Sequence, residues 1–224
     1  MKKNTRIALF ILAGALIGVF MIPLLRDGVK KSSTGTPNPR ASQNEKTNSN
    51  ADDTMKTYLE LRDQVFKTNP QEFKFKQTKE NPNVWGVVVD IGTPLGPTTM
   101  VSLTDGTTSL YTGSGGGIIG GGGNTDILNA TQNLVLTSED FYKHMKKTAN
   151  FPLPKVGFIN FYILTYDGIY LENADENDLS TGMHKLTGLY HKVQEVLTQL
   201  RLADEKKEAK PEGAEPQPSD EIKP

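Results

Sequence analysis

The chain has 224 residues, and its lack of cysteine excludes a disulfide framework, thiolate zinc sites, iron–sulfur clusters and a cysteine nucleophile. Its 25 basic and 26 acidic residues give a net charge of −1, so nucleic acid is not expected as a partner. Both ends have compositions unsuited to a packed core, which leaves residues 52–203 as the expected globular domain.

Residues 1–30 predict a membrane anchor. An uncharged run begins at Ile7 and ends at Leu25, and a helix of that length crosses roughly 30 Å of hydrocarbon. A cleaved signal peptide is the alternative, since a basic start before an apolar run fits both. The small-x-small site from Ala13 to Ala15 comes too early in the run for cleavage, so we favour a retained, single-pass anchor.

Two features of this segment bear on its arrangement in the membrane. Basic residues stand on both sides of it, so the positive-inside rule leaves open which side carries the domain. Gly14 and Gly18 form a G-x-x-x-G step that would let two such helices approach closely. Glycine is also common in membrane helices generally, and we favour that simpler explanation.

The regions on either side of the expected domain are polar. Residues 31–51 are mainly Ser, Thr, Asn, Pro, Gln and charged residues, which predicts a flexible stalk. Residues 204–224 are mainly Glu, Lys, Pro and Ala, which predicts a disordered tail.

Three segments have the apolar period of a helix. The first ends before Asn69-Pro70, the second begins with Asn124 or Thr125 as N-cap, and the third follows Asp178. The residues that share one face of each expected helix, most of them apolar, are Met55, Tyr58, Leu59, Arg62, Val65 and Phe66; then Ile127, Thr131, Leu134, Ser138, Phe141 and Met145; then Met183, Leu186, Tyr190, Val193, Leu197 and Leu200.

Five segments have the composition of strands. The run from Val84 to Ile91 is nearly continuous in apolar residues, which is typical of a strand buried on both faces. Asp105-Gly106 and Asp167-Gly168 each predict a tight hairpin, which pairs residues 100–103 with 107–111 and residues 158–165 with 169–171. The sequence therefore predicts an α+β domain with a five-stranded, mainly antiparallel sheet and three packed helices, preceded by one transmembrane helix.

This order of elements resembles the roadblock and longin group of small α/β domains. The segment Trp85-Gly86-Val87-Val88-Val89-Asp90 is similar to the first strand of that group, and residues 105–123 are similar to a family of bacterial membrane-anchored proteins. Roadblock domains usually place two strands before the central helix and three after it, whereas this sequence predicts three and two. The resemblance implies a dimerising or partner-binding platform without chemistry of its own.

The most unusual segment is a glycine-rich loop, with eight glycines among the eleven residues from Gly113 to Gly123. Glycines that precede a helix expose backbone N–H groups near its positive end, which is how phosphates are bound. Against a phosphate site, no Lys-Ser or Lys-Thr follows, and Asp126 would repel an anion. We favour a packed loop whose Ile118 and Ile119 enter the core or a partner. The ligand-binding candidates are Gly115, Gly116, Gly117, Gly120, Gly121, Asn124 and Asp90.

Asp90 belongs to this set because the segment from Val87 to Thr93 is similar to the first phosphate motif of the actin and sugar-kinase superfamily. In that motif the aspartate positions a magnesium ion. Such enzymes need two lobes, which about 150 residues cannot supply, so we expect Asp90 to end a buried strand before a turn. If Asp90 lay beside the glycine loop, the two together would be the one credible site in this sequence for magnesium and phosphate.

Other polar clusters give weaker signals. The alternating ligands at the start of an EF-hand calcium loop are matched by Asn173, Asp175 and Asn177. The position of the turn glycine in such a loop is taken by Asp178, so we expect these residues to cap the third helix instead. His144, His184 and His191 are expected on the surface. We therefore predict no metal site, no cofactor and no catalytic residue.

These observations predict a membrane-tethered, non-enzymatic interaction domain that binds a protein partner or forms a homodimer. The alternative is a small-ligand or nucleotide-binding domain that uses the glycine-rich loop at residues 113–123.

Overall fold

The computed structural model describes residues 43–119 and 123–208. The chain forms the following elements, in order: α2 (Gln43–Phe66), η1 (Pro70–Phe73), β1 (Val84–Thr93), β2 (Gly96–Leu103), β3 (Thr108–Thr112), β4 (Gly117–Ile119), α3 (Thr125–Ser138), η3 (Tyr142–His144), β5 (Lys146–Thr148), β6 (Phe158–Thr165), β7 (Gly168–Asp175), α4 (Glu176–Ser180) and α5 (Thr187–Glu208).

The strands form one antiparallel sheet in the order β4-β3-β2-β1-β6-β7-β5. The expected count of five strands was wrong, because this sheet has seven. The two additional strands, β4 and β5, are three residues long and lie at opposite edges. β4 has two isoleucines but lies within a glycine-rich segment, and β5 begins with two lysines, so neither segment was recognised as a strand.

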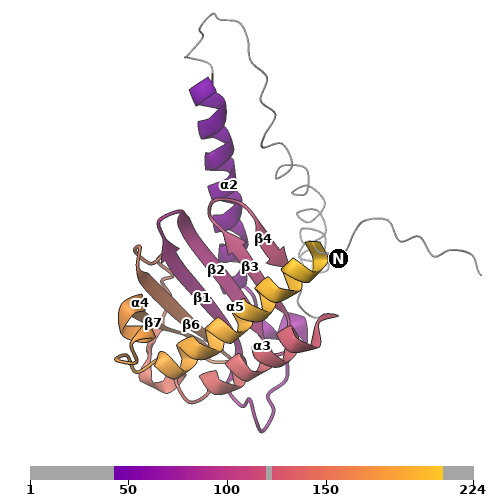
Figure 1. The fold of residues 1–224 in the computed structure, drawn as a ribbon. Helices are drawn as coiled ribbons and strands as arrows, with labels where there is room; N and C mark the ends of the chain where they lie inside the picture. Colours follow the sequence, from indigo (N-terminus) through magenta and orange to yellow (C-terminus); the bar gives the residue numbers. More distant parts are fainter. Residues whose placement is uncertain (1–42, 120–122, 209–224) are drawn as a thin grey trace, which may run out of the picture.

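Helices cover both faces of the sheet (Figure 1). On one face α3 and α5 lie side by side, and their apolar side chains form a core with alternate residues of β1, β2 and β6. On the other face the second half of α2 packs against the intervening residues of the same strands. As a result β1 is buried along almost its whole length, which confirms the prediction for this segment.

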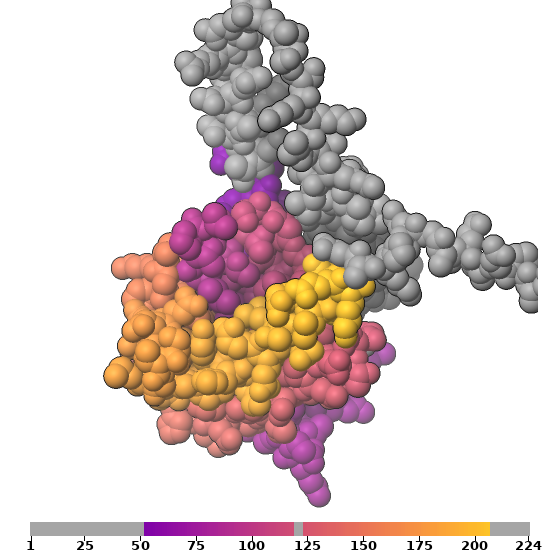
Figure 2. Space-filling view, in the orientation of Figure 1, coloured from indigo at the N-terminus to yellow at the C-terminus, as the bar shows by residue number. Residues whose placement is uncertain are grey.

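Expectations for the helices were partly wrong, because residues 43–119 and 123–208 form four α-helices where three were predicted. The third predicted helix, expected to follow Asp178, begins only at Thr187 as α5; the short helix α4 precedes it, and Gly182 in the loop between them has a φ of 81°. Met183 lies in that loop and is 82 % exposed, so it does not belong to the apolar stripe. Figure 2 shows α5 crossing one face of the domain as a ridge.

The ends of the domain differ from the expected boundaries. The first helix, α2, begins at Gln43, within the stretch expected to be stalk, and α5 continues to Glu208. Within residues 43–119 and 123–208 no helix has both the length and the apolar composition needed to cross a membrane. The transmembrane helix expected between Ile7 and Leu25, with Gly14 and Gly18, lies outside these residues.

Candidate functional site

A cluster of buried polar side chains lies between α2 and the sheet. It contains Tyr58, Arg62, Asp90, Thr99, Asn160 and Tyr162, which we call the polar cluster; of these only Tyr58 and Arg62 belong to α2. Arg62 donates two hydrogen bonds to Asp90 Oδ2, at 2.9 Å from Nε and 2.5 Å from Nη2. Thr99 donates to Asp90 Oδ1 at 2.6 Å, and the Tyr58 hydroxyl lies 2.7 Å from the Thr99 hydroxyl. Both oxygens of the Asp90 carboxyl are therefore occupied.

The same cluster holds the segment that leads into β6. The Tyr162 hydroxyl donates to the carbonyl oxygen of Pro152 at 2.6 Å, and Asn160 donates to the same carbonyl at 2.9 Å. Next to them Phe66 stacks on Phe151, with ring centroids 4.2 Å apart. The polar cluster thus fastens both α2 and this segment to the face of the sheet.

Burial controls the ionisation of these groups. It raises the pKa of the Asp90 carboxyl, and the hydrogen bonds from Arg62 and Thr99 offset part of that rise. Desolvation lowers the pKa of Arg62, but its bonds to Asp90 outweigh this and the pKa is raised. Burial also raises the pKa of Tyr58 and of Tyr162 to about 12. Since a neutral Asp90 would leave the buried guanidinium without a counter-ion, we assign the pair as ionised at neutral pH.

The glycine-rich segment folds into the β3–β4 hairpin rather than a single loop. Its turn contains Gly115 and Gly116, whose φ values are 93° and 102°, in the region that favours glycine. Gly117 lies in β4, and a Cβ added there would be 2.3 Å from the carbonyl oxygen of Leu110. Gly120 and Gly121 lie outside the described residues. The glycines in this hairpin permit a tight turn and a close approach of two backbones.

Asn124 has a structural role at the start of α3. Its side-chain oxygen accepts hydrogen bonds from the amides of Asp126 and Ile127, which confirms it as the N-cap. These are the first-turn amides that an anion would use. The cap already engages them, and the Asp126 side chain adds negative charge at the same helix end.

The structure does not bring Asp90 next to the glycine-rich hairpin. A single row of paired residues crosses the sheet from Asp90 on β1 through Thr99 on β2 and Tyr111 on β3 to Gly117 on β4. Three strand spacings separate the ends of this row, or roughly 14 Å. Among the described residues, no group of three His, Asp or Glu side chains is placed to hold a metal ion. Asp175, one of the EF-hand candidates, caps α4 by accepting from the amide of Asn177.

The buried partner of Asp90 was not identified from the sequence, although a signal was present. Arg62 interrupts an otherwise apolar stripe between Tyr58 and Val65, and Asp90 interrupts the apolar run of β1. Opposite charges that each lie within an apolar face are expected to pair, because a lone buried charge is strongly unfavourable.

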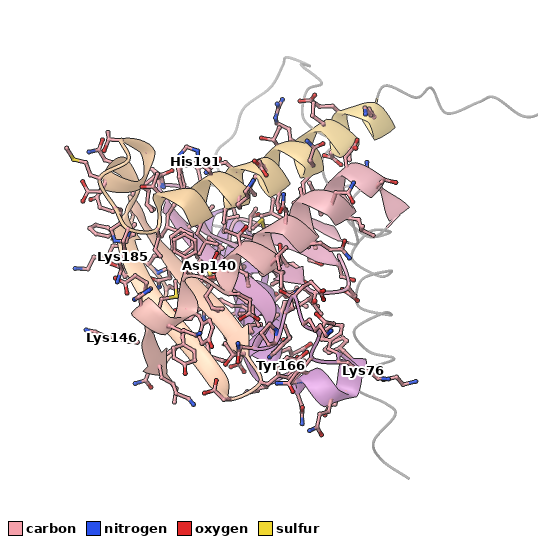
Figure 3. All side chains as sticks on the ribbon, turned by 90° about the horizontal axis from the view of Figure 1, so that it is seen from below. Lys76, Asp140, Lys146, Tyr166, Lys185 and His191 are labelled. Carbon is pink, nitrogen blue, oxygen red and sulfur yellow. The ribbon has the colours of Figure 1, made fainter. Side chains whose placement is uncertain are left out.

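The two edges of the sheet have opposite chemistry. At one edge, β5 contains Lys146 and Lys147, both exposed, and Lys147 forms an ion pair with Asp167 at 3.3 Å. Figure 3 shows Lys146 at the outer margin of the domain. At the other edge, β4 pairs with β3 only, as far as the described residues extend, and no charged residue occurs from Gly113 to Thr125. Lysines on an edge strand prevent pairing with another chain, and β4 has no such protection.

Comparisons of this chain with protein-family models, with curated proteins and with solved structures gave no match.

Proposed function

We propose that this chain is a membrane-tethered interaction domain without chemistry of its own, which binds protein through the free edge of β4. The observation that carries the proposal is the difference between the two sheet edges. An uncharged edge strand presents unpaired N–H and C=O groups that pair readily with a further strand. The lysines of β5 leave the other edge unsuited to the same contact.

The state of the charged groups inside the domain supports this proposal. Arg62 and Asp90, the charged residues of the polar cluster, bind each other, and both oxygens of Asp90 accept hydrogen bonds. Their arrangement holds α2 against the sheet. In the proposed function α2 connects the domain to the stalk and to the anchor at residues 7–25, so the pair fixes the point on the sheet from which the flexible stalk starts.

Site-specific photo-crosslinking of the full-length protein in membranes tests the proposal. A photo-crosslinking amino acid is placed at Ser114, which is exposed in the turn beside β4, and in a matched control at Lys146 on β5. We expect a discrete crosslinked species from Ser114 that is absent from Lys146. The absence of such a species from Ser114, or equal yields from both positions, would contradict a binding role for the β4 edge.

A further inference from the structure

The backbone of β4 points alternate groups toward the free edge. Its pairing with β3 matches Tyr111 with Gly117, Leu110 with Ile118 and Ser109 with Ile119. The amide of Thr112 donates to the carbonyl of Gly116 at 3.1 Å, so the neighbouring pair at Gly117 is a non-hydrogen-bonded one. By alternation, Ile118 bonds to β3, while the N–H and C=O groups of Gly117 and Ile119 face outward.

We infer that the occupant of this edge is a second copy of β4, paired antiparallel about a two-fold axis at Ile118. In this register Gly117 of each copy lies opposite Ile119 of the other, and all four outward N–H and C=O groups of each strand are paired. Moving the two-fold axis by one residue, to Gly117 or to Ile119, would place only that residue opposite its own copy and would leave the other without a partner in β4. An interface in which the same surface meets itself is the common form of a homodimer. This inference rests on the proposed function and specifies its partner.

The chemistry of the edge favours a second copy over the remaining segments of this chain. Residues 26–42 contain Pro37 and Pro39, and residues 209–224 contain four prolines, a composition that disfavours strands. Two copies of β4 meet without like-charge repulsion because residues 113–125 carry no charge. Ile118 packs half-buried against the core on the α3 and α5 face, so two Ile118 side chains would meet on one face of the joined sheet.

The geometry is compatible with two chains in one membrane. A two-fold axis that relates antiparallel strands of one sheet is perpendicular to the sheet, so each face continues across the interface. Both α2 helices then lie on the same face of the dimer and run in opposite directions along it, so a membrane on that side can hold both anchors. The paired segment is only three residues long, so association of the two copies in dilute solution is weak. Tethering both copies in one membrane strengthens this association, because it raises the effective concentration of each copy near the other.

Disulfide crosslinking tests the register, because the chain has no cysteine of its own. In a non-hydrogen-bonded antiparallel pair the Cα atoms are about 4.5 Å apart, within the range of a disulfide. We expect full-length Ile118→Cys in membranes to form a dimer on treatment with a copper–phenanthroline oxidant. Lys146→Cys on β5 is the matched control and is expected to remain monomeric. A monomeric Ile118→Cys variant, or equal crosslinking at both positions, would overturn the inference.

A second variant tests whether the outward backbone groups are used. Ile119→Pro removes an outward N–H and none of the bonds to β3, so its melting temperature is expected to match that of Ile119→Ala, which loses the same side chain and keeps the N–H. Two hydrogen bonds across the two-fold axis are lost, and we expect association of the Ile118→Cys chain to weaken by about thirty-fold. Unchanged crosslinking in this background would overturn the inference. A species crosslinked from Ser114 that contains one copy and a different protein would also overturn it, but would leave the proposed function intact.

Discussion

Replacing Arg62 by methionine removes the cation paired with the buried Asp90 carboxylate. The Asp90 side chain is 0 % exposed and that of Arg62 is 8 % exposed, so water cannot take the place of the lost partner. Methionine keeps a long apolar side chain beside Phe66, and Asp90 retains only its bond from Thr99. Removing one member of a buried ion pair typically costs about 3–5 kcal/mol, a large part of the roughly 5–15 kcal/mol that stabilises a domain.

The double variant Arg62→Met/Asp90→Val should recover most of that loss. With both charges removed, Tyr58 and Thr99 still bond to each other, and Tyr162 still donates to Pro152. No member of the polar cluster is then left charged or unpaired by the change. We expect each single variant to lose about 3–5 kcal/mol and the double variant to lie within about 2 kcal/mol of the parent.

Urea unfolding of residues 43–208, followed by tryptophan fluorescence, measures these differences. Trp85 is the only tryptophan in the chain and is 3 % exposed in the core beneath α2. Additive losses in the double variant, or single losses below about 1 kcal/mol, would refute the assignment of Arg62 and Asp90 as a coupled, buried pair.

The pH dependence of the same variants gives an independent measurement. A carboxyl with a raised pKa binds a proton more readily in the folded state, so its contribution to stability falls as pH rises from 3.8, the ordinary value, through the folded pKa. Arg62 lowers the pKa of Asp90, so Arg62→Met raises it further. The loss of stability in Arg62→Met should therefore be largest at neutral pH and smaller in acid, whereas Asp90→Val should lack this dependence. A loss independent of pH would argue against a buried carboxylate as its cause.

Three further predictions concern the glycine-rich hairpin and the anchor. Gly117→Ala should lower the free energy of unfolding by about 1–3 kcal/mol, because its Cβ meets the Leu110 carbonyl. Gly123→Ala should raise the free energy of unfolding by about 0.4–1 kcal/mol, because nothing lies within 4 Å of its Cβ. Thermal melts that rank the two variants in the reverse order would contradict the hairpin geometry. Calorimetric titration with ATP and magnesium should show no saturable binding, since the Asn124 side chain already engages the first amides of α3, and micromolar binding would support the nucleotide alternative. The full-length protein should stay in the membrane fraction after carbonate washing, and a mature N-terminus between Gly18 and Lys31 would show that the anchor is cleaved.

The sequence predicted those elements whose signals are local. The helix α3 begins at the expected asparagine cap, although it ends at Ser138 and the predicted stripe ran on to Met145, and β1 lies where its long apolar run was expected. The turns at Asp105-Gly106 and Asp167-Gly168 connect β2 to β3 and β6 to β7, as expected. Caps, turns and periodic runs are specified by neighbouring residues, which explains why one sequence suffices to find them.

The elements that were missed owe their structure to distant partners. The strand β5, with Lys146, Lys147 and Thr148, forms because β7 lies beside it. In the same way Gly117 belongs to a strand because β3 lies beside it. Likewise Asp90 was expected to end a strand, whereas β1 continues to Thr93 and the carboxyl is neutralised from α2. Pairing and burial of this kind depend on residues far away along the chain, and no local pattern specifies them.

The position of α2 relates the buried ion pair to the hairpin that carries β4. A Cβ added to Gly113 would lie 3.0 Å from Met55 Cε, and one added to Gly115 would lie 3.0 Å from Thr54 Cγ2, so α2 passes directly beside the hairpin turn. Two turns further along the same helix, Arg62 fixes α2 to the sheet through Asp90. The pair therefore sets the place of the helix that supports the hairpin. In the proposed function α2 also leads to the stalk, so the contact that stabilises the domain fixes where the stalk begins relative to the β4 edge.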